Sequence, residues 1–475
     1  MRRRPALAIV FATSAAILIV EITAGRLLAP YVGVSLETFT AVIGTILAGI
    51  ATGAAVGGHL ADRHDPRRLL GPSMVVGGGL VWLAVPIVRA VGPSAQSRPL
   101  DIVVLAGIAF FLPAAALSAV TPIVAKLRLR DLAETGSVFG GLSAAGTFGG
   151  LAGTFLTGFV LVTLLGTRTI MFTVGLLLVV GGLALELVLR RRPPTAATVV
   201  VLVAGGLSVY GFAAPCDVET RYACAEIEVD ERDPSLVSLY LDSLHHARVD
   251  LDEPSNLELR YIRLLADVAE ALPAGPLDAL HIGGGGFTIP GHLAEIRPGT
   301  RSHVVEIDPG VVDIARDHLG LETGPDLTVE VRDARIALPR LPDDAYDLVI
   351  GDAFSGQSVP WHLTTVELVE EVDRVLRDGG VYAVNVIDGG PSGFARAELA
   401  TLRAVFDHVE VVLPTAEPPG AKRNQILVAS DRPIPDLDVD PADGVVRDEA
   451  FVARYVGGAE VLTDDHAPVD QLVRG

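Results

Sequence analysis

Apolar residues are concentrated in the first 215 positions, in long runs that short polar loops separate. Each run approaches or exceeds the roughly 20 residues that a helix needs to cross a bilayer. The first run is too long for a cleaved signal peptide, and no small-residue cleavage site follows it. The pattern predicts about seven membrane-spanning helices, near 6–28, 38–58, 69–91, 101–123, 138–160, 168–189 and 196–214.

From about residue 216 the pattern changes to short β-branched runs that alternate with helical stretches, which favours a parallel sheet flanked by helices. The predicted strands are Leu277–Ile282, Ser302–Ile307, Leu327–Val331, Asp347–Ile350, Val381–Ile387, Val409–Leu413 and Gln425–Ala429. Three shorter runs before them predict a small antiparallel β unit, at Ile227–Val229, Leu236–Leu241 and Ala247–Val249.

These patterns together predict the domain organisation. We expect a multi-pass α-helical membrane domain over 1–215, then a linker and small β unit over 216–275. A Rossmann-like, methyltransferase-type α/β domain follows over 276–475.

Charge divides the chain at the same place. Residues 1–215 hold 8 acidic and 16 basic residues, and the rest of the chain holds 49 and 21. Nucleic acid is not an expected partner of so acidic a domain, because phosphate binding needs the opposite charge. Two interpretations remain open. Lys126 and Lys422 are the only lysines, which is typical of a solvated surface suited to high salt, whereas an acidic cleft would also attract a cationic substrate.

Basic residues in alternate loops predict the orientation of the spans. Cytoplasmic loops of membrane proteins carry an excess of Lys and Arg, so the pattern places the N-terminus in the cytoplasm. Seven spans then favour an extracytoplasmic second half, and this depends on counting 196–214 as a span. Cys216 and Cys224 follow that run, and both a disulfide and two free thiols remain open. The basic groups are Arg2–Arg4, Arg63 with Arg67 and Arg68, Lys126 with Arg128 and Arg130, and Arg190–Arg192.

Glycines and acidic residues follow four successive predicted strands. Gly283–Gly286 follow the first strand, Glu306 and Asp308 the second, Asp333 the third and Asp352 the fourth. Ligands of such sheets bind beyond the carboxyl ends of the strands. Glycines let the backbone approach a ligand, and an acid about 20 residues further on can accept hydrogen bonds from a ribose diol. The arrangement predicts a nucleoside site.

At this point the chain resembles a known family, spermidine synthase, over roughly residues 225–430. The segments that resemble its successive motifs are His281–Phe287, Val305–Asp308, Arg332–Ala334 and Tyr346–Asp352, with Leu239–His246 resembling its N-terminal hairpin and Tyr261 in the following helix. With the apolar half, the chain looks like the membrane-fused branch of that family. The segment Gly57–Arg63 is similar to a loop of major facilitator transporters, although only half a transporter is present at most.

The resemblance implies an aminopropyltransferase that needs no metal and no resident cofactor. Its co-substrate would be decarboxylated S-adenosylmethionine, and an amine such as putrescine would attack the carbon beside the sulfonium. Asp352 would be the catalytic residue that faces the amine. The nucleoside and its tail would contact Gly283, Gly284, Gly285, Glu306, Asp333, Ala334 and His246, and the acceptor would contact Tyr261, Ser355, Asp464 and Asp465.

Three positions depart from the family pattern. Gly286 stands where the family usually has Asp, Ser355 replaces a second Asp, and His246 replaces Gln. Asp464 and Asp465 would supply replacement acids or form a solvated turn. The acceptor is therefore open. An S-adenosylmethionine-dependent methyltransferase and a non-catalytic membrane sensor or transport partner that binds a nucleoside or polyamine are the alternatives. The expected partners are a small amine and the lipid bilayer, and a homodimer stays open.

Overall fold

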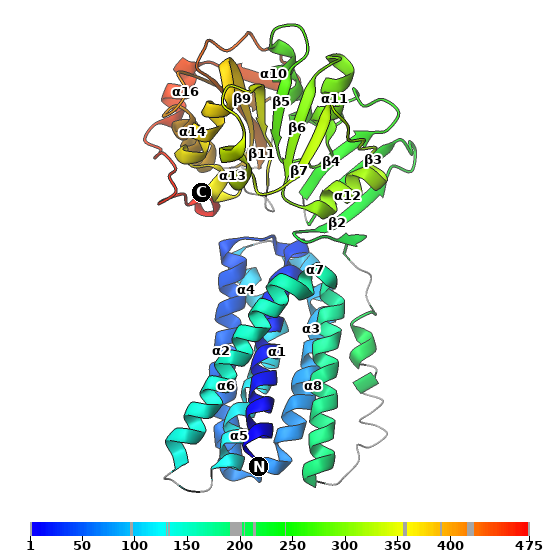
Figure 1. Ribbon diagram of the computed structural model, residues 1–475, viewed down its shortest axis with the longest axis vertical. Coiled ribbons are helices and arrows are strands. Elements are labelled where there is room, and N and C mark those ends of the chain that lie inside the picture. Colours follow the sequence, from blue (N-terminus) through cyan, green and yellow to red (C-terminus); the bar gives the residue numbers. More distant parts are fainter. Residues whose placement is uncertain are drawn as a thin grey trace. The chain divides into compact units, whose positions relative to one another are not determined.

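The computed structural model describes residues 2–95, 98–129, 131, 134–190, 202–203, 205–211, 215–242, 244–354, 359–389, 392–415 and 422–473. The chain divides into two compact units, Met1–Glu219 and Thr220–Gly475 (Figure 1). The two units meet at Glu219/Thr220, a few residues after the predicted boundary at 215/216. Residues 220–275 of the predicted linker and small β unit belong to the same compact unit as the α/β domain, and 216–219 belong to the first unit.

The first unit is a bundle of long helices. Six helical stretches in the described part of the chain are long and apolar enough to cross a membrane. Each of the first six predicted spans lies within one of them. The helices are α1 (Arg3–Val32), α2 (Leu36–Arg63), η1 (Pro66–Arg68), α3 (Leu70–Val91), η2 (Gly92–Ser94), α4 (Pro99–Ser118), α5 (Val120–Arg128), α6 (Thr135–Leu156), η4 (Thr157–Leu161), α7 (Val162–Leu164) and α8 (Thr167–Arg190).

The seventh predicted span, 196–214, lies largely outside the described residues. Its described parts include helical backbone at 202–203 and 205–208. Just beyond them, Val209 is fully buried, and the ring of Tyr210 meets that of Phe172 edge to face with 5.6 Å between centroids. The described part of this segment therefore packs on α8.

Glycines let the long helices of this unit approach closely. A Cβ atom added to Gly53 of α2 would lie 2.0 Å from the carbonyl oxygen of Ala115 in α4. One added to Gly149 of α6 would lie 2.2 Å from the carbonyl oxygen of Phe11 in α1. Larger residues would force these backbones apart, which is the role small residues have at helix contacts in membranes.

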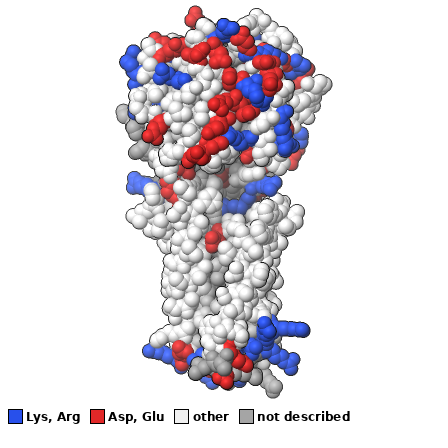
Figure 2. Space-filling view, turned by 60° about the vertical axis from the view of Figure 1, so that its left-hand side comes forward, with Lys and Arg blue, Asp and Glu red and all other residues white. Residues whose placement is uncertain are grey.

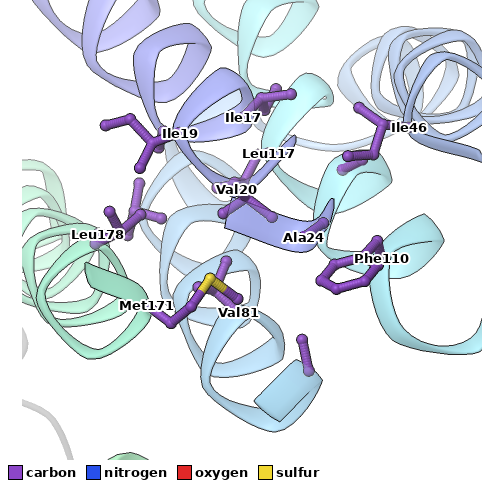
Figure 3. Close-up of a cluster of buried hydrophobic side chains, with 14 of the residues drawn as sticks. Ile17, Ile19, Val20, Ala24, Ile46, Val81, Phe110, Leu117, Met171 and Leu178 are labelled. Atoms are coloured by element: carbon purple, nitrogen blue, oxygen red, sulfur yellow. The ribbon is translucent and has the colours of Figure 1, made fainter. Parts of the chain in front are cut away.

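The core of the bundle surrounds α1, which runs through its middle (Figure 1). Figure 3 shows Val20 and Ala24 of α1 among side chains from α2, α3, α4 and α8. The side chains of Ile46, Phe110 and Met171 are fully buried there. The packed set that the figure labels is Ile17, Ile19, Val20, Ala24, Ile46, Val81, Phe110, Leu117, Met171 and Leu178.

Glu219 closes one end of the helical unit. Both of its carboxylate oxygens accept from the backbone N–H of Thr167, at 3.0 and 2.9 Å, and the guanidinium of Arg26 lies 3.5 Å away. Thr167 begins α8 and Arg26 lies in the last third of α1. Glu219 is therefore held at the end of the bundle opposite to the N-terminus of α1.

The second unit contains an eight-stranded sheet with the order β12-β10-β11-β9-β8-β5-β6-β7. Strands β5 to β9 are parallel to their neighbours in this group, and β10, β11 and β12 pair antiparallel. The strands are β5 (Asp278–Ile282), β6 (Arg301–Glu306), β7 (Leu327–Val331), β8 (Tyr346–Gly351), β9 (Leu376–Asp388), β10 (His408–Pro414), β11 (Arg423–Ser430) and β12 (Gly444–Arg447). All seven predicted strands are present, and β12 is additional.

A small sheet of order β1-β2-β3-β4 precedes this one. Its strands are β1 (Val218–Glu219), β2 (Cys224–Val229), β3 (Leu236–Leu241) and β4 (Leu244–Asp250). Cys216 and Cys224 are both disulfide-bonded. They are the two cysteines of the chain, so they form one disulfide with each other and are not free thiols.

Helices cover both faces of the large sheet (Figure 1). Alternation along each strand divides the apolar residues between the faces. Leu280 packs on one face with residues of α14 and α15, and its neighbour Ala279 packs on the other with residues of α10 and α11. The helices are α10 (Arg260–Ala271), α11 (Thr288–Ile296), α12 (Pro309–His318), α13 (Ala334–Ala337), η5 (Leu338–Arg340), η6 (Trp361–Leu363), α14 (Val366–Val375), α15 (Gly393–Leu402), α16 (Glu449–Val456) and α17 (Val469–Leu472). The sheet is Rossmann-like, as predicted.

Candidate active site

The glycine loop lies at the carboxyl end of β5 and packs directly on the residue that follows β8. A Cβ atom on Gly283 would lie 2.3 Å from the carbonyl oxygen of Asp352. Gly283 and Gly285 also have φ values of 99° and 49°, where side chains are strained. Glycine is therefore required at 283 both for backbone conformation and for space. The contact brings the loop and Asp352 together, as the sequence predicted.

Asp352 has a strongly raised pKa at this edge of the sheet. Burial raises the pKa of its carboxyl to about 6, and a hydrogen bond from Asn385 opposes that rise. The amide of Asn385 donates to Asp352 Oδ1 at 2.8 Å. A carboxyl with this pKa is poised to exchange a proton near neutral pH, which general acid–base catalysis requires.

Asn385 binds that carboxylate and Asn424 binds Asn385. Neither asparagine was predicted from the sequence. Asn385 lies in β9 and is 1% exposed, and its side-chain oxygen accepts from the amide of Asn424 in β11 at 3.0 Å. The two bonds fix the orientation of the Asn385 amide, so its nitrogen faces Asp352. The available signal was a lone amide, Val384-Asn385-Val386, inside an otherwise apolar strand. A buried polar group needs a partner, and here that partner is Asp352.

Glu306 lies at the end of β6 and is 7% exposed. One carboxylate oxygen accepts from the N–H of Gly284 at 2.7 Å, and the other accepts from that of Asp308 at 2.8 Å. Burial raises the pKa of its carboxyl, and these backbone bonds oppose the rise. Glu306 thus ties the second strand end to the glycine loop. Asp308 caps α12, because its carboxylate accepts from the N–H of Gly310 at 2.9 Å.

Asp333 follows β7 and caps the short helix α13. Its Oδ1 accepts from the N–H of Arg335 at 2.9 Å, and its Oδ2 lies 3.5 Å from Nε2 of His362. The next residue, Ala334, is buried. Asp333 is therefore at the predicted edge of the sheet, with His362 as a neighbour that the sequence did not indicate.

The hairpin of the small sheet contributes His246, which meets the first turn of α10. The hydroxyl of Tyr261 donates to the carbonyl oxygen of His246 at 2.8 Å. Burial lowers the pKa of His246 to about 4, so its imidazole is neutral at pH 7. Burial and the charge of Asp352 both raise the pKa of Tyr261. Tyr261 therefore contacts His246 and lies close enough to Asp352 to sense its charge.

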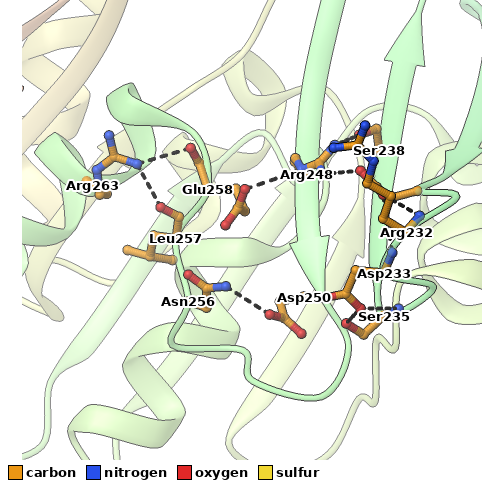
Figure 4. A network of polar contacts seen from close by, with 11 residues as sticks. Arg232, Asp233, Ser235, Ser238, Arg248, Asp250, Asn256, Leu257, Glu258 and Arg263 are labelled. Carbon is orange, nitrogen blue, oxygen red and sulfur yellow. Dashed lines mark hydrogen bonds and ion pairs between the residues drawn. The ribbon is translucent and has the colours of Figure 1, made fainter.

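A polar network holds that hairpin against the start of α10 (Figure 4). Arg248 of β4 contacts Asp230 at 2.8 Å and Glu258 at 3.4 Å. Arg263 of α10 donates to the carbonyl oxygens of Leu257 and Glu258 at 2.9 and 3.0 Å. The network fixes the loop between β4 and α10, and so fixes His246 relative to Tyr261.

Gly286, the first departure from the family pattern, has no room for a side chain. A Cβ atom there would lie 2.3 Å from Cβ of Ala247 and 3.2 Å from Cγ2 of Val249, both in β4. The Asp that the resemblance leads one to expect at this position does not fit beside Ala247. The absence of this acid is therefore built into the packing of the small sheet.

Two of the other predicted acceptor residues, Asp464 and Asp465, lie in the turn after Leu462. Asp464 forms an ion pair with Arg335, and its Oδ1 accepts from the hydroxyl of Thr365 at 2.8 Å. Asp465 is exposed in the adjacent turn. Asp464 is thus bound to α13 and to Thr365 at the start of α14, and its role as a replacement acid stays a prediction. Ser355 lies outside the described residues.

Acidic side chains gather in a band over the α/β unit on the face seen in Figure 2. Many of the unit's acids are paired with arginine. Asp278, for example, lies 2.7 Å from Arg301 and 2.7 Å from Arg377. Such pairs favour the interpretation of a solvated, ion-paired surface over that of a cleft that attracts cations.

No family model matches the chain. A polyamine aminopropyltransferase of Vibrio vulnificus is 36% identical over 133 residues, which are 28% of this chain and 44% of that protein. An N-terminal histidine N-methyltransferase of Emericella nidulans is 29% identical, over 40% of this chain and 35% of that protein. A probable spermidine synthase from Corynebacterium glutamicum is a solved structure that is 27% identical, with a TM-score of 0.49 over 53% of this chain and 97% of that one.

These similar proteins are transferases by name, and they divide between aminopropyl and methyl transfer. The chain spans less than half the length of the Vibrio vulnificus protein. The chain is thus similar to proteins named as aminopropyltransferases and to proteins named as methyltransferases.

Proposed function

We propose that the chain is a membrane-anchored transferase that moves an aminopropyl group from decarboxylated S-adenosylmethionine to an amine. The observation that supports this most is the carboxylate of Asp352, which lies beside the glycine loop and has a pKa that burial raises to about 6. Its charge also helps to raise the pKa of Tyr261. In this proposal Glu306 holds the ribose, Asp333 and Ala334 face the base, and His246 lies near the donor's tail. The name of the Vibrio vulnificus relative adds to that support.

The mechanism is a direct displacement. The amine attacks the carbon beside the sulfonium, the new C–N bond forms, and the C–S bond breaks with its electrons going to sulfur. A free alkylamine has a reference pKa of about 10 and is protonated at neutral pH. Asp352 accepts the proton and so exposes the lone pair. Asn385 keeps the carboxylate oriented throughout, and neutral His246 and Tyr261 add no competing charge.

The test is an assay of the purified full-length protein with each donor and a panel of amines, read by product mass. Aminopropyl adducts with the decarboxylated donor support the proposal. Asp352→Asn should abolish turnover while donor binding persists, because the carboxamide cannot take the proton. An unchanged rate in that variant would remove Asp352 from the mechanism, and donor binding without any product would favour a sensor.

A second candidate, methyl transfer, is favoured by the contact at Gly286. The aminopropyl donor carries an ammonium in its tail, and burying an unpaired ammonium is costly. Gly286 cannot carry an acid beside Ala247. S-adenosylmethionine, whose tail holds both a carboxylate and an ammonium, makes less demand for a second acid. Methylated products in the same assay, formed only from the carboxylated donor, would select this candidate.

We infer further that the chain crosses the membrane seven times and that its catalytic unit is extracytoplasmic. The loop charges support a cytoplasmic N-terminus. Helix α8 runs from the end where Glu219 is held back toward the N-terminal end, at Arg190. Between them, residues 202–203 and 205–208 are helical, and Gly206 lies near Trp82 and Phe172, which supports counting a seventh span. The disulfide of Cys216 and Cys224 suits an oxidising compartment.

A cysteine-labelling experiment tests this orientation. The chain has only two cysteines, so a membrane-impermeant thiol reagent applied to intact cells should label the protein only after reduction. Arg2→Cys in a Cys216→Ser/Cys224→Ser background is the matched control, and it should label only after the cells are opened. Labelling of the native pair only in opened cells would refute the external orientation and leave the enzymatic proposal intact.

A further inference from the structure

A pocket of about 100 Å³ opens at the N-terminal end of the helical unit, between α1, α5 and α6. Two arginines line it, Arg3 in the first turn of α1 and Arg128 at the last position of α5. The hydroxyl of Ser137, in the first turn of α6, is a third polar group, and it donates to the carbonyl oxygen of Glu134 at 3.0 Å. The polar part of the lining is thus strongly cationic.

The rest of the lining is apolar. Ala6 and Leu7 of α1 face Val138, Gly141 and Leu142 of α6 across the pocket. A Cβ atom on Gly141 would have Leu7 as its neighbour at 3.8 Å, so glycine there leaves space in the wall. Ala6, Val138 and Leu142 are buried. The pocket therefore joins two guanidinium groups to an apolar floor.

Two acids at this end, Asp62 and Asp65, have partners outside the pocket. Lys126, on the same short helix as Arg128, contacts Asp62 of α2 at 2.7 Å. Asp65 caps η1 by accepting from the N–H of Arg67 at 3.0 Å. Asp62, the acid in the last turn of α2, is thus matched by Lys126. Arg3 and Arg128 line the pocket together, where two like charges favour an anion between them.

We propose that this pocket binds the phosphate headgroup of an anionic phospholipid in the leaflet at the N-terminal end of the bundle. Guanidinium groups pair strongly with phosphate oxygens, and basic pockets between membrane helices bind such headgroups. The apolar walls, and the exposed side chains of Phe139 and Phe148 further along α6, suit acyl chains rather than a free ion. The inference rests on the six apolar helices lying in a membrane, and it is independent of the reaction catalysed.

Lipid binding can be measured on the full-length protein, delipidated in a neutral detergent, by native mass spectrometry and thermal melting. Phosphatidylglycerol, phosphatidylcholine and inorganic phosphate are titrated separately. Arg3→Gln/Arg128→Gln removes both pocket charges. Arg67→Gln/Arg68→Gln is the matched control, because it removes two exposed charges from η1 at the same end of the bundle. Gly141→Leu fills the wall and keeps both arginines.

Phosphatidylglycerol should bind more tightly than phosphatidylcholine, and the pocket double variant should weaken its binding about thirtyfold, as two basic groups near an anionic surface would. The η1 control should change it much less, because in delipidated protein its charges lie outside the pocket and do not contact the bound headgroup. Gly141→Leu should also weaken it. Equal binding of the two lipids, an equal loss in both double variants, or full occupancy by inorganic phosphate would overturn the proposal.

Discussion

Removing the amide of Asn385 should move the pH at which the enzyme loses activity. Its nitrogen donates to Asp352 Oδ1 at 2.8 Å. Burial raises the pKa of that carboxyl to about 6, and this hydrogen bond lowers the pKa and so limits the rise. In Asn385→Ala the carboxylate loses a bond of the kind that contributes about 1.5–3 kcal/mol when one partner is charged. One pKa unit corresponds to about 1.4 kcal/mol. Water that enters the space replaces part of the lost hydrogen-bond energy, so we expect the pKa of Asp352 to rise by about one unit.

The assay is the pH dependence of kcat with one saturating amine. Below its pKa, Asp352 carries a proton and cannot accept another, so activity falls on the acidic side. The midpoint of that fall should move from about 6 to about 7 in Asn385→Ala. The activity at high pH should be largely kept. The acceptor amine is the same in both enzymes, so its own titration does not produce the difference.

Asn424→Ala is the matched control for this experiment. It removes the amide that donates to Asn385 at 3.0 Å but leaves Asn385 beside Asp352. Its acidic limb should therefore move less than that of Asn385→Ala. An acidic limb that stays at the wild-type pH in Asn385→Ala, or a uniform fall in rate at every pH, would refute the idea that this bond sets the protonation of Asp352.

Three further predictions concern the same site. Asp352→Asn should raise the melting temperature at pH 7–8. The pKa of Asp352 in the folded state lies above its ordinary value, so the ionised carboxylate destabilises the folded state by roughly 2–3 kcal/mol once the pH has risen past about 6. The variant should gain no stability near pH 4, and an equal gain at that pH would contradict this cause. Gly286→Ala should lower stability by about 1–3 kcal/mol through overpacking, and adding Ala247→Gly should restore most of it; a melting curve that the second change leaves untouched would show that Ala247 is not the obstacle. Glu306→Gln replaces an oxygen that accepts a backbone N–H with a group that cannot, so donor KM should rise about tenfold or more; a change confined to kcat would argue against its role in donor binding.

Periodicity and hydropathy were sufficient for the coarse architecture. Runs of 20 or so apolar residues predicted the first six long helices, since membrane spans demand length and composition and little else. The order of β-branched runs predicted the seven strands from β5 to β11. Strand β12 was missed because Gly444–Arg447 is short and only partly apolar.

The site was predictable where a residue follows directly from a strand end. Gly283, Glu306, Asp333 and Asp352 all lie at the carboxyl edge of the sheet, because parallel strands place their ends together. The two asparagines that orient Asp352 were not predictable. Asn424 contacts Asn385 because β11 pairs with β9, and no local sequence pattern encodes that pairing. The ion pair between Asp464 and Arg335 was not predictable for the same reason, because the two residues are distant in sequence.

The contact between Gly286 and Ala247 links two positions that local sequence patterns treat as independent. Whenever a relative of this chain carries a side chain at 286, either position 247 must shrink to glycine or β4 must withdraw from the loop. The two sites should therefore vary together across relatives, even though one belongs to the glycine loop and the other to the hairpin. Relatives that differ at residue 286 should then differ in the geometry of the hairpin even where their catalytic residues are the same. Grafting the acid alone onto this scaffold is the wrong route to a diamine-using variant, and a transplant of loop and hairpin together is the productive one.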